Sequence, residues 1–511
     1  MNTWSEGYQS EVEYTYGYFS ELNPAKTELC CLLAGITPPK IATACELGYG
    51  QGVTLNIHAA ASGAKWWGTD FNAAHAAFAK DLAESACLPS LPSELSFQEF
   101  SEQCDEQFDF IGLHGIWSWV SDANREAISN FIRKRLRPGG IAYVSYNALP
   151  GAGPMAPAKF LMTEYANQPQ ASVASPSGKI GQVLGFVEQL IAAQPAFLRV
   201  NPAVLSRLSD FKNKDARYLA HEYLNEHWNP QHFTEVARTL SQAKLEFACS
   251  ASLIDHLDAI NLSVEQRNLL DSISDPHFRI LARDFMVNQG FRRDYWVKGA
   301  RRLTGAEQCE RLRALRFTLM RTDTEIEYKI RGYQQEATLD PGIYEPILQA
   351  FQNSPIRTIS EIEQSVSGKK FTLAQVVESL VVLMAKGDID VVQSEALLNR
   401  VAPLCNALNR EIMGRAKFSS RLEYLSSPLL GGGVPVSRME LLFLDGRSQG
   451  SKGPEFWARH AYDILSGQGE KISKAGKVLE KAEDARDEVS RHAHVFAQKK
   501  LPVLQRLLCV D

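Results

Sequence analysis

The stretch ACELGYGQGVTLNIHAAASGAKWWGTDFN, from Ala44 to Asn72, decides the fold. A short apolar run ends in Glu46, glycines follow at alternate positions, and a segment of helix-compatible composition comes next. This pattern predicts a strand, a tight turn and a helix. A second apolar run ends in Asp70, and an acidic residue there is typical of doubly wound α/β sheets that hold the ribose of an adenosine-containing ligand.

The spacing of Gly48, Gly50 and Gly52 argues against NAD, because the dinucleotide fingerprint needs its third glycine one residue later. Glycine lets the backbone approach a ligand closely. S-adenosylmethionine carries no phosphate and needs no phosphate cradle at the helix N-terminus. We therefore expect Glu46 to face its ammonium group and Asp70 its ribose hydroxyls, although one glycine motif by itself also fits a simple tight connection.

Three later segments support this interpretation. EQFDFIGLHGIWSWV (106–120) predicts a fourth strand, and LRPGGIAYVSYN (136–147) predicts a helix end, a turn and a fifth strand. SFQEFSEQ (96–103) is expected where the third strand ends beside the adenine. All three match the layout of class I S-adenosylmethionine-dependent methyltransferases.

Six motifs carry a closer resemblance: YGYFSELNP (16–24), ACELGYGQG (44–52), LHGIWSWVS (113–121), VSYNALPG (144–151), LAHEYLNEHWNP (219–230) and FACSASL (247–253). In this order they resemble the bacterial class I methyltransferases with a methyltransferase regulatory domain, a group that includes lysine methyltransferases acting on outer-membrane proteins. The resemblance covers residues 8–300. It implies a protein-lysine N-methyltransferase that uses S-adenosyl-L-methionine and methylates a protein, such as an outer-membrane or surface protein before export.

The fold implied is α/β, with a Rossmann-like class I methyltransferase sheet of seven strands and added helical and winged-helix-like C-terminal domains. KLEFACSASL and FRRDYWVKG are strand-like and are expected to supply the sixth and seventh strands. The expected domains are the S-adenosylmethionine-binding core (1–150), a helical insertion acting as a lid or as a homodimer contact (151–217), the regulatory domain with the last strands (218–300), a winged-helix-like domain (305–400) and a mostly helical C-terminal region (401–511).

The acceptor chemistry guides the choice of catalytic residues. A lysine side chain is protonated at neutral pH, so an apolar pocket or a base must favour the neutral amine, and aromatic walls tolerate the cation. HGIW stands where many amino-methyltransferases carry an Asp/Asn-Pro-Pro-Tyr motif, which disfavours nucleotide-base and glutamine acceptors. The expected catalytic residues are His114, as proton acceptor or as ligand-orienting group, Trp117, Trp119 and Tyr18 of the tyrosine-rich N-terminal arm.

The expected cofactor-binding set combines the glycine turn with the ends of the later strands. The family tends to have an aspartate after the third strand, and Glu99 is expected to replace it from a shifted position. Tryptophans more often fill protein cores than ligand cages, so a structural role is the alternative for each aromatic residue. The set is Glu46, Gly48, Tyr49, Gly50, Gly52, Asp70, Phe71, Glu99, Phe100 and His114.

Several other classes of function are disfavoured. His221 and His227 are too far apart for the H-E-x-x-H pattern of zincins, so no metal is expected and both histidines are interpreted as buried or capping residues. The cysteines form no C-x-x-C pair, and neither a signal peptide nor a long apolar run occurs. The chain is therefore expected to be cytoplasmic, without stable membrane insertion.

The C-terminal third predicts three helices and then strands over 341–400, the order of a winged-helix module. Acidic residues outnumber basic ones there and the net charge of the chain is −5, so no nucleic acid is expected. Leu429–Arg438 is predicted to form a loop. A helical stripe is predicted from Ile472, Ala475, Leu479, Ala482, Val489 and Phe496.

Two alternative functions remain at this point. The first is a small-molecule or glycan-tailoring methyltransferase with the same catalytic domain. The second is a non-catalytic regulatory protein that keeps the S-adenosylmethionine-binding fold. Large added domains favour a macromolecular acceptor, and the intact glycine turn with Asp70 counts against the non-catalytic alternative.

Overall fold

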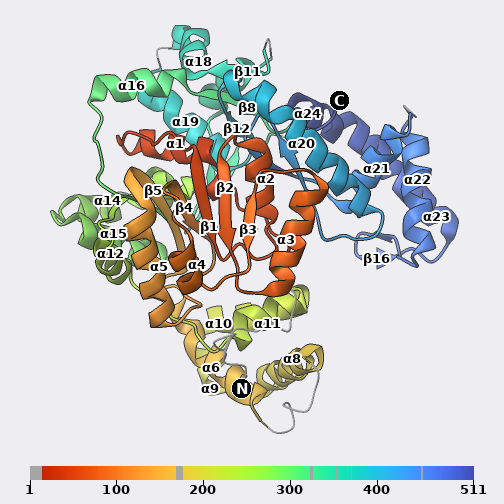
Figure 1. The fold of residues 1–511 in the computed structure, drawn as a ribbon, viewed down its shortest axis with the longest axis horizontal. Helices are drawn as coiled ribbons and strands as arrows, with labels where there is room; N and C mark the ends of the chain where they lie inside the picture. Colours follow the sequence, from red (N-terminus) through yellow and green to blue (C-terminus); the bar gives the residue numbers. More distant parts are fainter. Residues whose placement is uncertain (1–13, 169–175, 323–325, 353, 370, 451–452) are drawn as a thin grey trace.

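The computed structural model describes residues 14–168, 176–322, 326–352, 354–369, 371–450 and 453–511. A seven-stranded sheet with the order β3-β2-β1-β4-β5-β7-β6 lies at its centre (Figure 1). The strands run parallel except for β7, which is antiparallel to both of its neighbours. This confirms the expected class I methyltransferase sheet. The strands are β1 (Thr43–Leu47), β2 (Lys65–Thr69), β3 (Leu91–Ser93), β4 (Phe108–Leu113), β5 (Leu136–Asn147), β6 (Glu246–Ser250) and β7 (Phe291–Val297).

Helices cover both faces of this sheet. The side chains of β1 and β5 alternate between two hydrophobic cores, one packed against α1, α2 and α3 and the other against α4, α5 and α12. Asn72 caps α3 by accepting hydrogen bonds from Ala74 N and His75 N. The helices are α1 (Pro24–Leu33), α2 (Val53–Ala61), α3 (Ala73–Ser85), α4 (Phe97–Gln103), α5 (Asp122–Arg135) and α12 (Phe233–Ser241).

The segment SFQEFSEQ differs from its expected role. It does not end the third strand, because β3 finishes earlier, at Ser93, and Phe97–Gln103 forms α4. Ser96 and Glu99 form a capping box at the start of this helix, with the Ser96 main-chain N–H donating to Glu99 Oε2.

A small helical unit follows β5 and lies near the lower edge of the sheet in Figure 1. It has a hydrophobic core of its own, which runs from Met155 to Leu224. Its helices are α6 (Ala156–Ala166), α8 (Pro176–Ala192), α9 (Ala196–Val200), α10 (Pro202–Ser209) and α11 (Ala216–Leu224).

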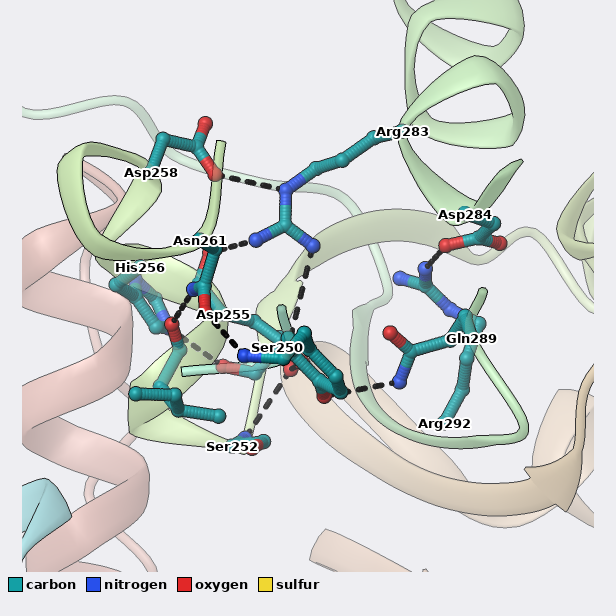
Figure 2. A network of polar contacts seen from close by, with 12 residues as sticks. Ser250, Ser252, Asp255, His256, Asp258, Asn261, Arg283, Asp284, Gln289 and Arg292 are labelled. Carbon is teal, nitrogen blue, oxygen red and sulfur yellow. Dashed lines mark hydrogen bonds and ion pairs between the residues drawn. The ribbon is translucent and has the colours of Figure 1, made fainter. Parts of the chain in front are cut away.

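A buried polar network stabilises the edge of the sheet formed by β6 and β7. Arg292 pairs with Asp294 at 2.8 Å and with Asp284 at 2.5 Å, and both carboxylates are fully buried. Figure 2 shows the second pair beside Gln289, and Arg283 reaching Asp258. Because side chains alternate along a strand, Arg292 points into this network, whereas Phe291 and Arg293 point to the other face of β7. The helices here are α13 (Asp258–Asn261), α14 (Val264–Asp271) and α15 (Pro276–Val287).

Residues 305–392, here called the middle domain, contain the three helices expected over 341–400 and a three-stranded sheet of order β11-β8-β12. Its core includes Leu29 and Leu32 of α1, which ties it to the catalytic sheet. The expected order of three helices followed by strands is wrong, because β8 precedes the helices and β11 lies between the first and the second of them. The winged-helix assignment stays a prediction. The elements are α16 (Gly305–Ala314), β8 (Arg316–Leu319), β9 (Lys329–Arg331), β10 (Glu336–Thr338), α17 (Pro341–Gln349), β11 (Ile356–Thr358), α18 (Ile359–Ser365), α19 (Leu373–Ala385) and β12 (Ile389–Val392).

The C-terminal domain corrects two expectations. The predicted loop Leu429–Arg438 contains β14, which pairs with β13, and the predicted helical stripe begins too early, because Ile472–Leu479 spans a hairpin. The domain shares one hydrophobic core with the outer side of α2. Its elements are α20 (Glu395–Ala416), β13 (Tyr424–Ser427), β14 (Gly432–Pro435), α21 (Arg438–Ser448), α22 (Pro454–Gly467), β15 (Ser473–Lys474), β16 (Lys477–Val478), α23 (Ala482–Val495) and α24 (Leu501–Arg506).

No helix within the described ranges is both long and apolar enough to cross a lipid bilayer.

Candidate functional site

A cavity of about 670 Å³ lies at the ends of β1, β2 and β4, and residues of α11 form part of its wall. In parallel α/β sheets, ligands bind at this carboxyl edge. Its walls come from the N-terminal segment, the glycine turn, the loops after β2, β3 and β4, the helices α10 and α11, and β7. Of the expected site residues, it is lined by Gly48, Tyr49, Gly50, Asp70, Phe71, His114 and Trp119.

The glycine turn needs glycine at each of its three positions. Gly48, Gly50 and Gly52 have φ angles of +70°, +58° and +68°, in the left-handed region that favours glycine. A β-carbon on Gly48 would overlap the Ile116 side chain, and one on Gly52 would lie 2.6 Å from Ala79 Cβ. The turn is therefore packed tightly against Ile116 and Ala79. Gly48 and Gly50 line the cavity.

Asp70 ties the glycine turn to the end of β2. Its Oδ2 accepts a hydrogen bond from Gly50 N at 2.8 Å, and its Oδ1 accepts one from Asn72 N at 3.0 Å. His75 Nδ1 lies 3.3 Å from the same Oδ1. The carboxylate is thus fixed at the cavity wall, where a ligand hydroxyl can still reach it, and its role toward a ribose stays a prediction.

Glu46 lies behind the turn rather than on the cavity surface. The residue is 1% exposed, and its Oε2 has no hydrogen-bond partner among the described residues. Burial, with a smaller contribution from the negative charge of Asp70, raises the pKa of this carboxyl to about 8. A buried carboxyl oxygen that has no hydrogen-bond partner in the described residues, next to the glycine turn, fits a binding group for a cationic ligand.

His114 directly follows β4 and lines the cavity. Its imidazole stacks on Phe19 with ring centroids 3.6 Å apart, and its Nδ1 lies 2.8 Å from Tyr143 Oη. Burial, with the positive charge of Arg293, lowers the pKa of His114 to about 3. Such an imidazole is a poor acceptor for the proton of an ammonium group, so the expected proton-acceptor role does not fit. The ligand-orienting role stays a prediction.

The two tryptophans after β4 point to different places. Trp119 lines the cavity, whereas Trp117 is fully buried in a core beside the sheet and donates from Nε1 to Gln231 Oε1. Trp119 N donates to Ile116 O at 2.8 Å, and this turn separates the two rings. The expected wall role of Trp117 is therefore wrong, because its indole already has a core environment and a partner.

Tyr18 also lies away from the cavity. Its ring packs against His58 and Tyr424, with centroids 5.2 Å and 5.5 Å away, at the junction with the C-terminal domain. From the same arm, Tyr14 lines the cavity and Phe19 stacks on His114. The N-terminal arm does supply aromatic walls, but Tyr18 is not one of them.

The third-strand assignments need a similar correction. Glu99 is solvent-exposed and is occupied by its capping box, and Phe100 is 4% exposed in the core, 5.3 Å from the ring of Phe131. The cavity is instead lined here by Leu95, Ser96 and Phe97. The S-x-x-E capping pattern that begins at Ser96 was the signal for a helix at this place.

A further wall of the cavity is built by α11, which sequence reasoning missed. Tyr218, His221 and Glu222 of this helix line the cavity, and so does His227 after it. His221 packs edge-on against Tyr14, with ring centroids 5.0 Å apart. The HEYLNEH motif therefore contributes residues to the cavity wall.

Glu222 is the carboxylate of this wall. It is partly buried, and its Oε1 lies 3.5 Å from Arg207 Nη2. Burial raises the pKa of Glu222 above its ordinary value, although the charges of Arg207 and Lys159 oppose the shift. The cavity is thus lined both by the glycine turn with Asp70 and by a carboxylate of α11 among aromatic rings.

Comparison with known proteins places the chain in a family. A family described as a predicted methyltransferase regulatory domain matches residues 215–298. The protein sll1526 of Synechocystis is 36% identical over 510 residues, which cover 99% of this chain and 99% of that protein. The chain belongs to the sll1526 family. RP789 of Rickettsia prowazekii is 23% identical over 309 residues, covering 56% of this chain and 54% of that protein.

A solved structure shows the same architecture. PKMT2 from Rickettsia typhi, in complex with AdoHcy, superposes with a TM-score of 0.69 at 18% identity, over 97% of this chain and 100% of that one. At this identity the likeness shows the fold. Together with the matched regulatory domain, the fold is that of an S-adenosylmethionine-dependent methyltransferase.

Proposed function

We propose that this chain is a protein-lysine N-methyltransferase that uses S-adenosyl-L-methionine and acts on an outer-membrane or surface protein before export. The observation that carries the proposal is one cavity lined both by the glycine turn and by Glu222 of α11, which lies among aromatic rings. The resemblance to lysine methyltransferases of outer-membrane proteins and the AdoHcy complex of PKMT2 support it.

The residues around the glycine turn fit S-adenosylmethionine. The turn brings main chain to the cavity without a β-carbon at Gly48 or Gly50, and Asp70 lies at its rim. Glu46 beneath it has an oxygen without a partner in the described residues. The cofactor would supply an electrophilic methyl group, and the task of the chain is to hold the acceptor amine in line with it.

The residues on and around α11, which form the proposed acceptor end of the cavity, fit a lysine acceptor. Tyr14, Trp119 and Tyr218 offer aromatic rings on the cavity wall, which tolerate an ammonium group and its methylated product. A lysine side chain must lose a proton before it can attack. Glu222 is the carboxylate of this wall, and burial raises its pKa, which makes it a stronger base toward that proton.

The direct test is to incubate purified protein and methyl-labelled S-adenosylmethionine with fractionated cell extract. We expect label in acid-precipitable protein, recovered after hydrolysis as methyl-lysine. Label only in the small-molecule supernatant would contradict the proposal and favour the small-molecule or glycan alternative. Label in neither, together with no binding of the cofactor, would favour the non-catalytic alternative.

Glu46 predicts a proton release on cofactor binding. With a pKa of about 8, this carboxyl is mostly protonated at pH 7 in the ligand-free chain. A bound cation favours the charged form and lowers that pKa. Binding at pH 7 should therefore release protons, and affinity should rise as pH increases from 7 toward 8.

Titration calorimetry in buffers of different ionisation enthalpy measures this release. Glu46→Gln, which keeps the shape of the side chain, should abolish the dependence of the observed heat on the buffer and should weaken binding. The same dependence in the wild type and in Glu46→Gln would exclude Glu46 as the source of the proton.

A further inference from the structure

Lys159 of α6 is a buried lysine directly behind the acceptor end of the cavity. The residue is 6% exposed, and its Nζ donates to Glu222 O at 3.1 Å and to Asn225 O at 3.3 Å. These carbonyls lie at the C-terminal end of α11, where helix carbonyls lack intrahelical partners and a cation is favourable. One ammonium group thus holds the end of the helix that carries Glu222.

The same ammonium group lies over two aromatic rings. Its Nζ is 4.9 Å from the ring centroid of Trp119 and 5.7 Å from that of Trp228. Trp228 Nε1 in turn donates to Asn147 Oδ1 at 3.1 Å. Burial lowers the pKa of Lys159 to about 8, so the group is charged at neutral pH, and the nearby Glu222 favours that charge.

Lys159 reaches the cavity only through its partners. Glu222, Asn225, Trp119 and Asn147 line the cavity, whereas Lys159 is not part of the wall. Lys159 contacts three of these wall residues directly and the fourth, Asn147, through Trp228. It can therefore fix the shape of the acceptor end without contacting an acceptor.

We infer that Lys159 is a positioning residue, which fixes Glu222 and Trp119 in the arrangement that receives an acceptor lysine. This inference rests on the proposed function. We expect cofactor binding to be independent of Lys159, because the glycine turn and Asp70 have contacts of their own.

The kinetic test compares Lys159→Met with Lys159→Arg. Methionine removes the charge and the donors, so kcat/KM for the protein acceptor should fall by about tenfold to a hundredfold, with the cofactor dissociation constant unchanged. Arginine keeps a cation and donors and should restore part of the activity. Lys212→Met, an exposed lysine of the same helical unit, is the matched control and should behave as the wild type.

A second readout does not need a methyl acceptor. Hydrogen exchange of the main-chain amides in 216–224 should become faster in Lys159→Met and stay unchanged in Lys212→Met, while exchange in 48–52 stays the same in both. This readout distinguishes the two proposals, because a chain that methylates no lysine would still show the loosened helix.

Three results would overturn the inference. The first is wild-type exchange in 216–224 of Lys159→Met. The second is a fall in kcat/KM for the protein acceptor in Lys159→Met that is no larger than the accompanying rise in the cofactor dissociation constant. The third is an arginine variant that folds and yet is as impaired as the methionine variant.

Discussion

Glu222→Gln is expected to lower kcat for lysine methylation by about a hundredfold or more, within the range that general acid–base catalysis contributes. Glutamine keeps the size of the side chain and cannot accept the proton of the acceptor ammonium. Cofactor binding should not change, because the glycine turn is held by its hydrogen bond to Asp70, whereas Glu222 belongs to another element, α11.

Single-turnover kinetics and cofactor titration separate the two effects. Because burial raises the pKa of Glu222, wild-type activity should fall as pH drops through that pKa, and this acid limb should disappear in the variant. Glu164→Gln changes an exposed carboxylate on α6 outside the cavity wall and serves as the control. Full activity of Glu222→Gln would show that the proton leaves by another route.

Arg292→Met should reduce the free energy of unfolding by about 3 to 5 kcal/mol, the usual cost of removing one partner from a buried ion pair. The change leaves Asp284 (Figure 2) and Asp294, both fully buried, without their cation. The pairing of β7 with β5 and β6 depends on this region, so the loss should be global.

Urea unfolding at pH 7 measures the loss. Arg302→Met is the control, because that side chain is 61% exposed and its ion pair with Glu246 is 3.8 Å long; it should shift stability by less than about 0.5 kcal/mol. Adding Asp294→Asn to Arg292→Met should recover part of the stability by removing one uncompensated charge. A loss below about 1 kcal/mol for Arg292→Met would mean that water reaches the two carboxylates.

The sheet could be predicted because its signals are local. The glycine turn, the acid after β2 and the alternation of apolar runs with helical segments each occupy one short stretch, and they specify strand, turn and helix. The final strand could be placed because aromatic residues concentrate in FRRDYWV, whereas EFACS of β6 carries a weaker signal, a single phenylalanine.

The acceptor end could not be predicted by the same reasoning. Trp117 and Trp119 have nearly identical sequence surroundings, and only the turn between Ile116 and Trp119 sends one ring into the core and the other into the cavity. Glu222 lies far along the chain from the glycine turn, and its approach depends on how the helical unit folds back. Such tertiary contacts leave no periodic trace in the sequence.

The shared core of α2 and the C-terminal domain limits how this protein can be divided. Val53, Ile57 and Ala60 of the helix that follows the glycine turn pack with side chains from Val392 to Cys509. Removing the C-terminal third would place the outer side of α2 in water and unsettle the turn at its N-terminus. The last residues of the chain are thus structural parts of the catalytic unit, and a truncated fragment is an unsuitable starting point for engineering or crystallisation.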